Sequence, residues 1–267
     1  MDSTLLNLGI FQIKWYSFFI FIAVITASFI IIRESKNKNI DKDAIIDIIF
    51  YSLIFGIIGA RIYYILFNLD FYLKSPIEML KIWNGGLAIH GGIIGALIFL
   101  LVYTKKKKMN FLLLLDILVV GVIIAQSIGR WGNFFNGEAY GRIVSLSFLK
   151  GMHLPKFIID NMYINGKYRE PTFLYESIFS LIGFIILIIV RKNKNIKVGQ
   201  LTGIYLIWYG LERLIIESFR SDSLMLGPLK IAQIVSIIFC IVGIYLLFKN
   251  IKNNNKLYKE EKIFLKK

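Results

Sequence analysis

Seven apolar runs divide the chain, and each is long enough to cross a membrane as a helix. They cover residues 16–32, 44–67, 86–104, 110–128, 171–190, 199–219 and 228–248. The hydrocarbon core of a bilayer is roughly 30 Å thick, and a helix of about 20 apolar residues spans it. The pattern predicts an all-α polytopic membrane protein with about seven transmembrane helices, in a single membrane domain covering residues 1–267.

The composition points the same way. Hydrophobic residues make up 57% of the chain, charged residues make up 18%, and the mean hydropathy is +0.65. A soluble domain is about 45–50% apolar and about 25% charged, so this chain has more apolar surface than a water-soluble core buries. The basic residues of the first run follow its apolar stretch, which argues against a cleaved signal peptide. A single cysteine, Cys240, excludes an internal disulfide.

Positive charge is concentrated on one side of the predicted membrane. The net charge is +15, and 19 of the 32 lysines and arginines fall in segments 33–43, 105–108, 191–198 and 249–267. Cytoplasmic loops carry such an excess, so we expect the N-terminus outside and residues 249–267 to form a cytoplasmic basic tail. Topology then explains the charge, with membrane lipids as partners and no nucleic acid. Residues 129–170 are predicted to form a small extracytoplasmic head loop.

Six charged or ionisable side chains in or next to the predicted spans map to the outer half of the membrane. Such groups are costly in a bilayer, and each is therefore a functional candidate. The set consists of Arg61, His90, Arg130, Arg213, Glu217 and Arg220. Their common depth predicts that a polar group is handled at the outer leaflet.

The sixth run contains a regular polar stripe, in the sequence YGLERLIIESFR. Tyr209, Arg213 and Glu217 are spaced four residues apart, and Arg220 follows three residues after Glu217. This spacing places them along one face of a helix. Two arginines against one glutamate favour an anion site. The alternative is an ion-pair ladder that only locks helices together.

The segment GRWGNFFNGEAYGR, residues 129–142, has the densest group of polar side chains. It offers Arg130, Asn133, Asn136 and Glu138 among four glycines that include Gly141. Glycines let backbone N–H groups approach a phosphate, and arginine presents a planar fork of donors that matches it. The segment therefore predicts a phosphate site at the membrane surface. The alternative is a glycine-rich turn with an aromatic belt.

His90 lies in NGGLAIHGGIIGA, residues 84–96. The glycines around it are typical of close helix packing, which does not account for the histidine. A histidine can accept a proton at physiological pH, so His90 is a candidate base, with a hydrogen-bonding structural role as the alternative. The chain has no GxxxxGK[ST], HExxH or GxSxG motif. Phosphate chemistry is therefore expected to rest on arginines, without a metal ion.

At these residues the chain resembles the bacterial prolipoprotein diacylglyceryl transferases. The resemblance extends over most of the chain through WY at 15–16, GARIYYILF at 59–67, NGGLAIHGGIIG at 84–95, GRWGNFFNGEAYGR at 129–142, PTFLYES at 171–177 and YGLERLIIESFR at 209–220. It implies that His90, Arg130 and Arg213 are catalytic. It further implies that the lipid is bound by Arg130 with Asn133, Asn136, Glu138, Gly141, Tyr16, Tyr209, Glu217 and Arg220. Arg61 joins this lipid-binding set because of its depth.

The resemblance implies an enzyme of the bacterial cytoplasmic (inner) membrane that needs no cofactor. It would transfer diacylglycerol from phosphatidylglycerol to the lipobox cysteine in the signal peptide of a preprolipoprotein, releasing glycerol phosphate. His90 is the candidate base, while a tyrosine or the lipid phosphate remain alternatives. From the residues alone, a transporter of an anionic solute and a non-catalytic lipid-binding protein also stay open.

Overall fold

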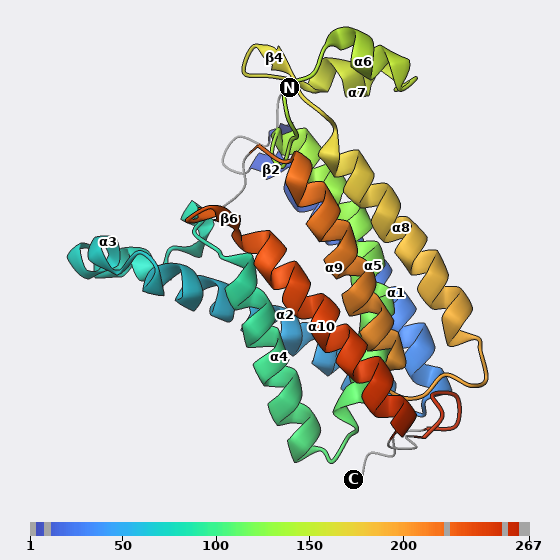
Figure 1. Ribbon diagram of the computed structural model, residues 1–267. Coiled ribbons are helices and arrows are strands. Elements are labelled where there is room, and N and C mark those ends of the chain that lie inside the picture. Colours follow the sequence, from blue (N-terminus) through green and yellow to red (C-terminus); the bar gives the residue numbers. More distant parts are fainter. Residues whose placement is uncertain (1–3, 8–11, 222–224, 253–255, 262–267) are drawn as a thin grey trace. The chain divides into compact units, whose positions relative to one another are not determined.

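The computed structural model describes residues 4–7, 12–221, 225–252 and 256–261, so parts of the predicted tail at 249–267 lie outside the described residues. Each predicted apolar run forms a long helix (Figure 1). These helices are α1 (Trp15–Asn37), α2 (Lys42–Leu66), α4 (Ile89–Lys106), α5 (Phe111–Asn136), α8 (Thr172–Arg191), α9 (Gln200–Phe219) and α10 (Ile231–Lys252).

Within the described ranges, 6 helices are long and apolar enough to cross a membrane. The remaining long helix, α9, has the same length as α8 but contains Glu212, Arg213 and Glu217, which make it more polar. The fold is that of an all-α polytopic membrane protein, as predicted. The predicted number of about seven spans holds when α9 is included.

Short elements connect the long helices. Between α2 and α4 lie α3 (Leu69–Lys74), η1 (Pro76–Leu80) and η2 (Ile82–Asn84); between α5 and α8 lie α6 (Leu146–Gly151) and α7 (Lys156–Asn161). Among the described residues, three two-stranded antiparallel sheets pair β1 (Thr4–Asn7) with β2 (Gln12–Lys14), β3 (Tyr163–Ile164) with β4 (Lys167–Tyr168), and β5 (Met225–Leu226) with β6 (Leu229–Lys230). The hydrophobic pattern did not predict these strands because they are too short to show an alternation of polar and apolar residues.

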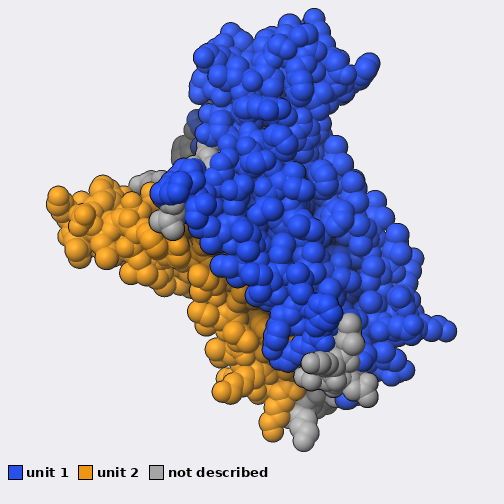
Figure 2. Space-filling model, in the orientation of Figure 1, with its two compact units in different colours: residues 1–31, 115–261 blue, residues 32–114, 262–267 orange. Residues whose placement is uncertain are grey.

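The chain forms two compact units (Figure 2). One contains residues 1–31 and 115–261, and the other contains residues 32–114 and 262–267. In the first unit, half of the most apolar stretch of α5 is buried (50%), against 11% in α1 and α10. In this unit α9 packs against both α8 and α10. The exposed apolar side chains of α1 and α10 are those expected of helices surrounded by lipid.

The first turn of α9 is fixed by a carboxylate on α5. Asp116 is fully buried and accepts hydrogen bonds from the backbone N–H of Gly199 (2.5 Å) and of Thr202 (2.8 Å), as well as from the Thr202 hydroxyl (2.6 Å). The first N–H groups of a helix have no partner within it, and an acidic side chain there also balances the helix dipole. Asp116 therefore ties the position of α9 to that of α5.

The end of α5 reaches into the segment expected to form the head. The helix continues to Asn136, so residues 129–136 are its last turns. Gly132 is required there because a Cβ atom would lie 3.1 Å from the Tyr16 ring on α1. The rest of the segment, with α6 and α7, lies at one end of α8 (Figure 1). A small core there joins Phe134 of α5 and Phe173 of α8 to Leu149, Ile158, Ile159 and Met162.

In the second unit, α2 and α4 pack closely through glycines. A Cβ atom on Gly59 would overlap the carbonyl oxygen of Gly91 and lie 2.9 Å from the Cα atom of Gly95. The glycines near His90 thus serve close helix packing, as their spacing predicted.

Candidate active site

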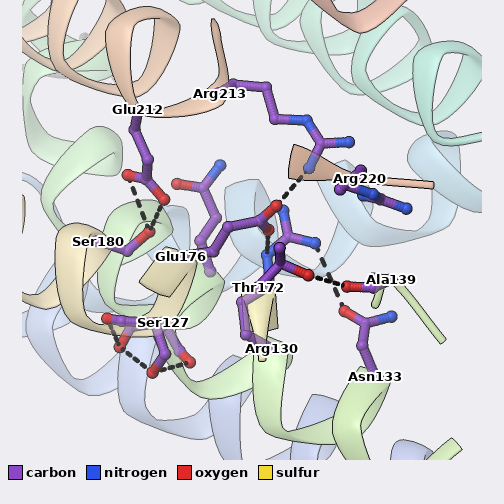
Figure 3. A network of polar contacts seen from close by, with 12 residues as sticks. Ser127, Arg130, Asn133, Ala139, Thr172, Glu176, Ser180, Glu212, Arg213 and Arg220 are labelled. Carbon is purple, nitrogen blue, oxygen red and sulfur yellow. Dashed lines mark hydrogen bonds and ion pairs between the residues drawn. The ribbon is translucent and has the colours of Figure 1, made fainter. Parts of the chain in front are cut away.

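Three helices of the first unit bring a cluster of arginines and carboxylates together (Figure 3). Helix α5 supplies Arg130 and α8 supplies Glu176, while α9 supplies Arg213 and Glu217. Arg220 follows directly after the last residue of α9. The predicted association of Arg130 with Arg213 is therefore present in the fold, and it depends on a third helix.

Glu176 joins the two arginines. Its Oε2 atom forms an ion pair with Nε of Arg130, and its Oε1 atom accepts a hydrogen bond of 2.6 Å from Nη1 of Arg213. The Glu176 side chain is buried. The sequence interpretation did not single out this residue, although its position inside an apolar run was the same signal that identified Arg213.

The polar stripe on α9 is present as its spacing predicted. Nη2 of Arg213 lies 2.7 Å from Oε2 of Glu217, and Nε of Arg220 lies 4.0 Å from the same oxygen. Glu217 thus contacts Arg213 closely and Arg220 at the limit of an ion pair. Tyr209 stacks on Tyr205 with 6.0 Å between the ring centroids.

The accessible part of the cluster is cationic. The side chains of Glu176 and Glu217 are 2% exposed, whereas those of Arg130, Arg213 and Arg220 are 18%, 16% and 12% exposed. Three arginines also outnumber these two glutamates. An arginine held through one edge by a carboxylate keeps other N–H donors for a second anion. The arrangement therefore suits an anion such as a phosphate.

Glu212 is a third buried carboxylate near the cluster, but it has a different partner. Its two oxygens lie 3.0 and 3.3 Å from the hydroxyl of Ser180. Figure 3 shows Glu212 and its chain neighbour Arg213 pointing to different partners on α8. Glu212 is thus held by the Ser180 hydroxyl on α8, whereas Glu176 and Glu217 are the carboxylates that pair with the arginines.

Residues of the glycine-rich segment lie around Arg130. Oδ1 of Asn133 accepts a long hydrogen bond of 3.5 Å from Nη1 of Arg130, and Nδ2 of Asn136 donates to Glu138 over 3.4 Å. Oδ1 of Asn136 is buried and has no hydrogen-bond partner among the described residues. The Tyr16 ring on α1 lies beside Gly132 of this segment, where a Cβ atom would be 3.1 Å away.

Gly141 has a packing role. Its N–H donates to the carbonyl oxygen of Glu170 over 2.9 Å, and its own carbonyl oxygen accepts from the Ser221 hydroxyl over 3.1 Å. A Cβ atom on Gly141 would lie 2.8 Å from Cβ of Glu170. Gly141 therefore allows residues 141–142 to pass close to the segment that leads into α8.

His90 and Arg61 both belong to the second unit. The His90 ring lies 6.2 Å from the Tyr63 ring, near the start of α4. Arg61 is buried and donates hydrogen bonds to backbone carbonyl groups of residues 78–86. The prediction that His90 acts together with Arg130 and Arg213 stays a prediction. In the described part of the chain, no group of three His, Cys, Asp or Glu side chains is placed to hold a metal ion.

Comparison of the chain with known proteins finds a matching family and close relatives. A family model described as "Prolipoprotein diacylglyceryl transferase" matches residues 3–249. A protein of Staphylococcus haemolyticus is 46% identical over 262 residues, which cover 97% of this chain and 92% of the relative. A protein of Staphylococcus aureus strain MSSA476 is 46% identical over 260 residues, with the same coverage. Both relatives are named phosphatidylglycerol–prolipoprotein diacylglyceryl transferase.

Proposed function

The chain belongs to the prolipoprotein diacylglyceryl transferase family, and we propose that it transfers the diacylglyceryl group of phosphatidylglycerol to the lipobox cysteine of preprolipoproteins. The family match over nearly the whole chain carries this assignment. In the reaction the cysteine sulfur attacks the glyceryl carbon next to the phosphate. A C–S bond forms, the C–O bond to the phosphate breaks, and glycerol phosphate leaves with the bonding electrons. The thiol proton passes to a base.

Arg130 and Arg213 hold the lipid phosphate in this proposal. Their guanidinium groups are the accessible part of a cluster whose carboxylates are buried, and a phosphodiester accepts paired N–H donors from such groups. Negative charge grows on the phosphate as the C–O bond breaks. Positive groups that are already fixed in place stabilise that charge most effectively.

The neighbouring side chains orient this pair and complete the headgroup site. Glu176 and Glu217 fix the guanidinium planes through their ion pairs. Asn133, Asn136 and Glu138 are assigned to the glycerol headgroup, and the buried unpaired Oδ1 of Asn136 supports this because a headgroup hydroxyl can donate to it. Tyr16, Tyr209 and Arg220 border the same cluster.

His90 is the proposed base for the thiol proton. Its ring makes no side-chain hydrogen bond to a described residue, which leaves a ring nitrogen available to the substrate. The thiolate is the reactive form of cysteine, so a base next to the acceptor speeds the attack. A tyrosine hydroxyl or the lipid phosphate itself are the alternatives.

We place the enzyme in the bacterial cytoplasmic membrane, with the N-terminus outside and the basic C-terminal tail in the cytoplasm. The lysine and arginine distribution supports this orientation. The outer leaflet then supplies phosphatidylglycerol, and the signal peptide of the preprolipoprotein presents its cysteine from the same side.

The deciding experiment combines the purified protein with phosphatidylglycerol and a lipobox peptide and weighs the peptide by mass spectrometry. We expect an increase equal to one diacylglyceryl group, and no increase with a peptide in which the cysteine is replaced by serine. Lipid binding without any mass increase would support a lipid-binding protein instead. Flux of an anionic solute into liposomes, without transfer, would support a transporter.

A further inference from the structure

Arg61 on α2 is surrounded by the backbone of the segment that connects α3 to α4. The residue is 7% exposed. Nε donates to the carbonyl oxygen of Met79 over 3.0 Å, and Nη1 donates to those of Gly85 and Gly86 over 2.7 and 3.0 Å. Nη2 donates to the carbonyl oxygens of Glu78 and Lys81.

These contacts engage the whole hydrogen-bonding capacity of the guanidinium group. Arginine carries five N–H donors, and the five bonds go to five different backbone carbonyl groups. The ring of Tyr72 lies 5.2 Å from the guanidinium carbon and covers one face. A lipid phosphate could bind Arg61 only by displacing these carbonyl groups.

The segment that connects α3 to α4 needs hydrogen-bond donors such as those of Arg61 for its backbone carbonyl groups. It consists of two short 3₁₀ helices followed by Gly85 and Gly86, which both have positive φ. Such irregular backbone leaves carbonyl groups without partners, and an unpaired carbonyl near a bilayer is costly. Large apolar side chains on the same segment, including Ile77, Leu80 and Trp83, are exposed. Arg61 thus satisfies the backbone from inside while the apolar side chains point outward.

The path of this segment determines where α4 begins. The N–H of Ala88 donates to the carbonyl oxygen of Ala60 over 3.1 Å, next to Arg61 in the chain. No side chain caps the N-terminus of α4. His90 is the second residue of that helix. The backbone at residues 78–88 therefore helps to set the position of the His90 ring, together with the glycine contacts between α2 and α4.

We propose that Arg61 is a positioning residue: it fixes the backbone of residues 78–86, and through it the start of α4 and the His90 ring. This role replaces the direct lipid contact that its depth in the sequence suggested. The inference rests on the proposed function, in which His90 takes the thiol proton.

The kinetic test is Arg61→Lys, assayed in mixed micelles at varied mole fractions of phosphatidylglycerol. Lysine has its three donors on a single nitrogen and cannot reach five carbonyl groups. We expect kcat to fall on the order of 100-fold, as for a misplaced catalytic group, with KM for the lipid changed less than about twofold. A raised KM at nearly unchanged kcat would mean that Arg61 binds the phosphate, and would overturn the proposal.

A pair of glycine variants provides a test that leaves Arg61 in place. A Cβ atom on Gly86 would lie 2.5 Å from Nη1 of Arg61, whereas one on Gly85 would meet no atom within 4 Å. Both residues have positive φ, so alanine is strained at either position. We expect Gly86→Ala to reproduce the loss of kcat and Gly85→Ala to show a clearly smaller loss. Equal losses would contradict a role for the Arg61 contact.

Amide hydrogen exchange separates this proposal from the proposed function. In detergent, Arg61→Lys should speed the exchange of amides in residues 78–88 and leave those of α9 unchanged. This measurement needs no transferase activity, so it reads the role of Arg61 even if the protein transfers no lipid. Unchanged exchange at residues 78–88 would overturn the positioning role.

Discussion

At the scale of single residues, Glu176 links the two arginines of the cluster, since it contacts Arg130 through one oxygen and Arg213 through the other. Two guanidinium groups brought together without it would repel each other in a medium of low dielectric. With it, each arginine is held through part of its donor set and keeps other donors for the lipid. One buried carboxylate thus makes a two-arginine phosphate site possible.

The first prediction concerns Glu176→Gln. The amide keeps the shape but removes the charge, which leaves Arg130 without its carboxylate partner and Arg213 with Glu217 alone. Breaking a buried ion pair costs about 3–5 kcal/mol, and we expect kcat/KM for diacylglyceryl transfer to fall on the order of 100-fold. The measurement is transfer to a lipobox peptide at varied lipid content.

Glu170→Gln is the matched control for this variant. Glu170 is also buried and pairs with an arginine, Arg142, over 2.9 Å, but it belongs to the segment between α5 and α8. The Glu170→Gln variant should retain most of the transfer activity. Equal losses in the two variants would show that a general loss of stability, and not the arginine pair, explains the effect.

The second prediction concerns Arg130→Lys, which keeps the charge and loses the planar fork of donors. Nε of Arg130 is engaged by Glu176, and a lysine offers one nitrogen for both the glutamate and the phosphate. We expect near-complete loss of transfer, measured by mass spectrometry of the peptide. Arg142→Lys is the control, because the Arg142 side chain is 63% exposed. Wild-type activity in Arg130→Lys would refute paired donation to the phosphate.

At the scale of helices, two sets of contacts fix the helices that carry the candidate residues. Asp116 holds the beginning of α9 against α5, and α9 carries Arg213. Close contact between glycines holds α2 against α4, which carry Arg61 and His90. Asp116 acts on Arg213 at a distance, because a helix transmits the position of one turn to the next, whereas Gly91 of the glycine contact is the chain neighbour of His90.

The third prediction tests the glycine contact. Gly59→Ala would place a Cβ atom against the Gly91 carbonyl group and 2.9 Å from Cα of Gly95, whereas Gly56→Ala would place one at 3.5 Å from the Gly92 carbonyl oxygen. Overpacking costs about 1–3 kcal/mol. Thermal unfolding in detergent should show a lower midpoint for Gly59→Ala and little change for Gly56→Ala. An unchanged midpoint for Gly59→Ala would mean that the helices separate at no cost.

At the scale of the whole molecule, the charge distribution determines the expected orientation in the membrane. The lysine-rich segments alternate along the chain with segments in which basic residues are less dense. The segment between α5 and α8 lies on the expected outer side, together with the predicted lipid headgroup site. In the proposed function, this orientation would give the enzyme access to a preprolipoprotein that has crossed the membrane.

The fourth prediction tests this orientation by labelling single cysteines in intact cells. In a Cys240→Ser background, His153→Cys should react with a membrane-impermeant maleimide, and Lys107→Cys should react only after the membrane is permeabilised. His153 lies just after α6 and Lys107 just after α4. The reverse pattern would place the N-terminus in the cytoplasm and contradict the charge-based topology.

Much of the architecture was predictable because hydrophobicity acts over consecutive residues. A run of about 20 apolar residues must be a helix in a bilayer, whatever surrounds it. The pairing of Arg213 with Glu217 was predictable for a similar reason, since the helical period alone places residues four apart on one face. The resemblance of the motifs to one family, which the comparisons confirmed, supplied the activity.

The sequence alone therefore determined the class of fold, the positions of the spanning helices and the polar face of α9, all of which follow from neighbours along the chain. Only the tertiary structure decided that Glu176 joins Arg130 to Arg213 and that Arg61 is occupied by five carbonyl groups. These contacts connect residues on different helices and loops. Their partners are set by how the elements pack, and no period in the sequence encodes that.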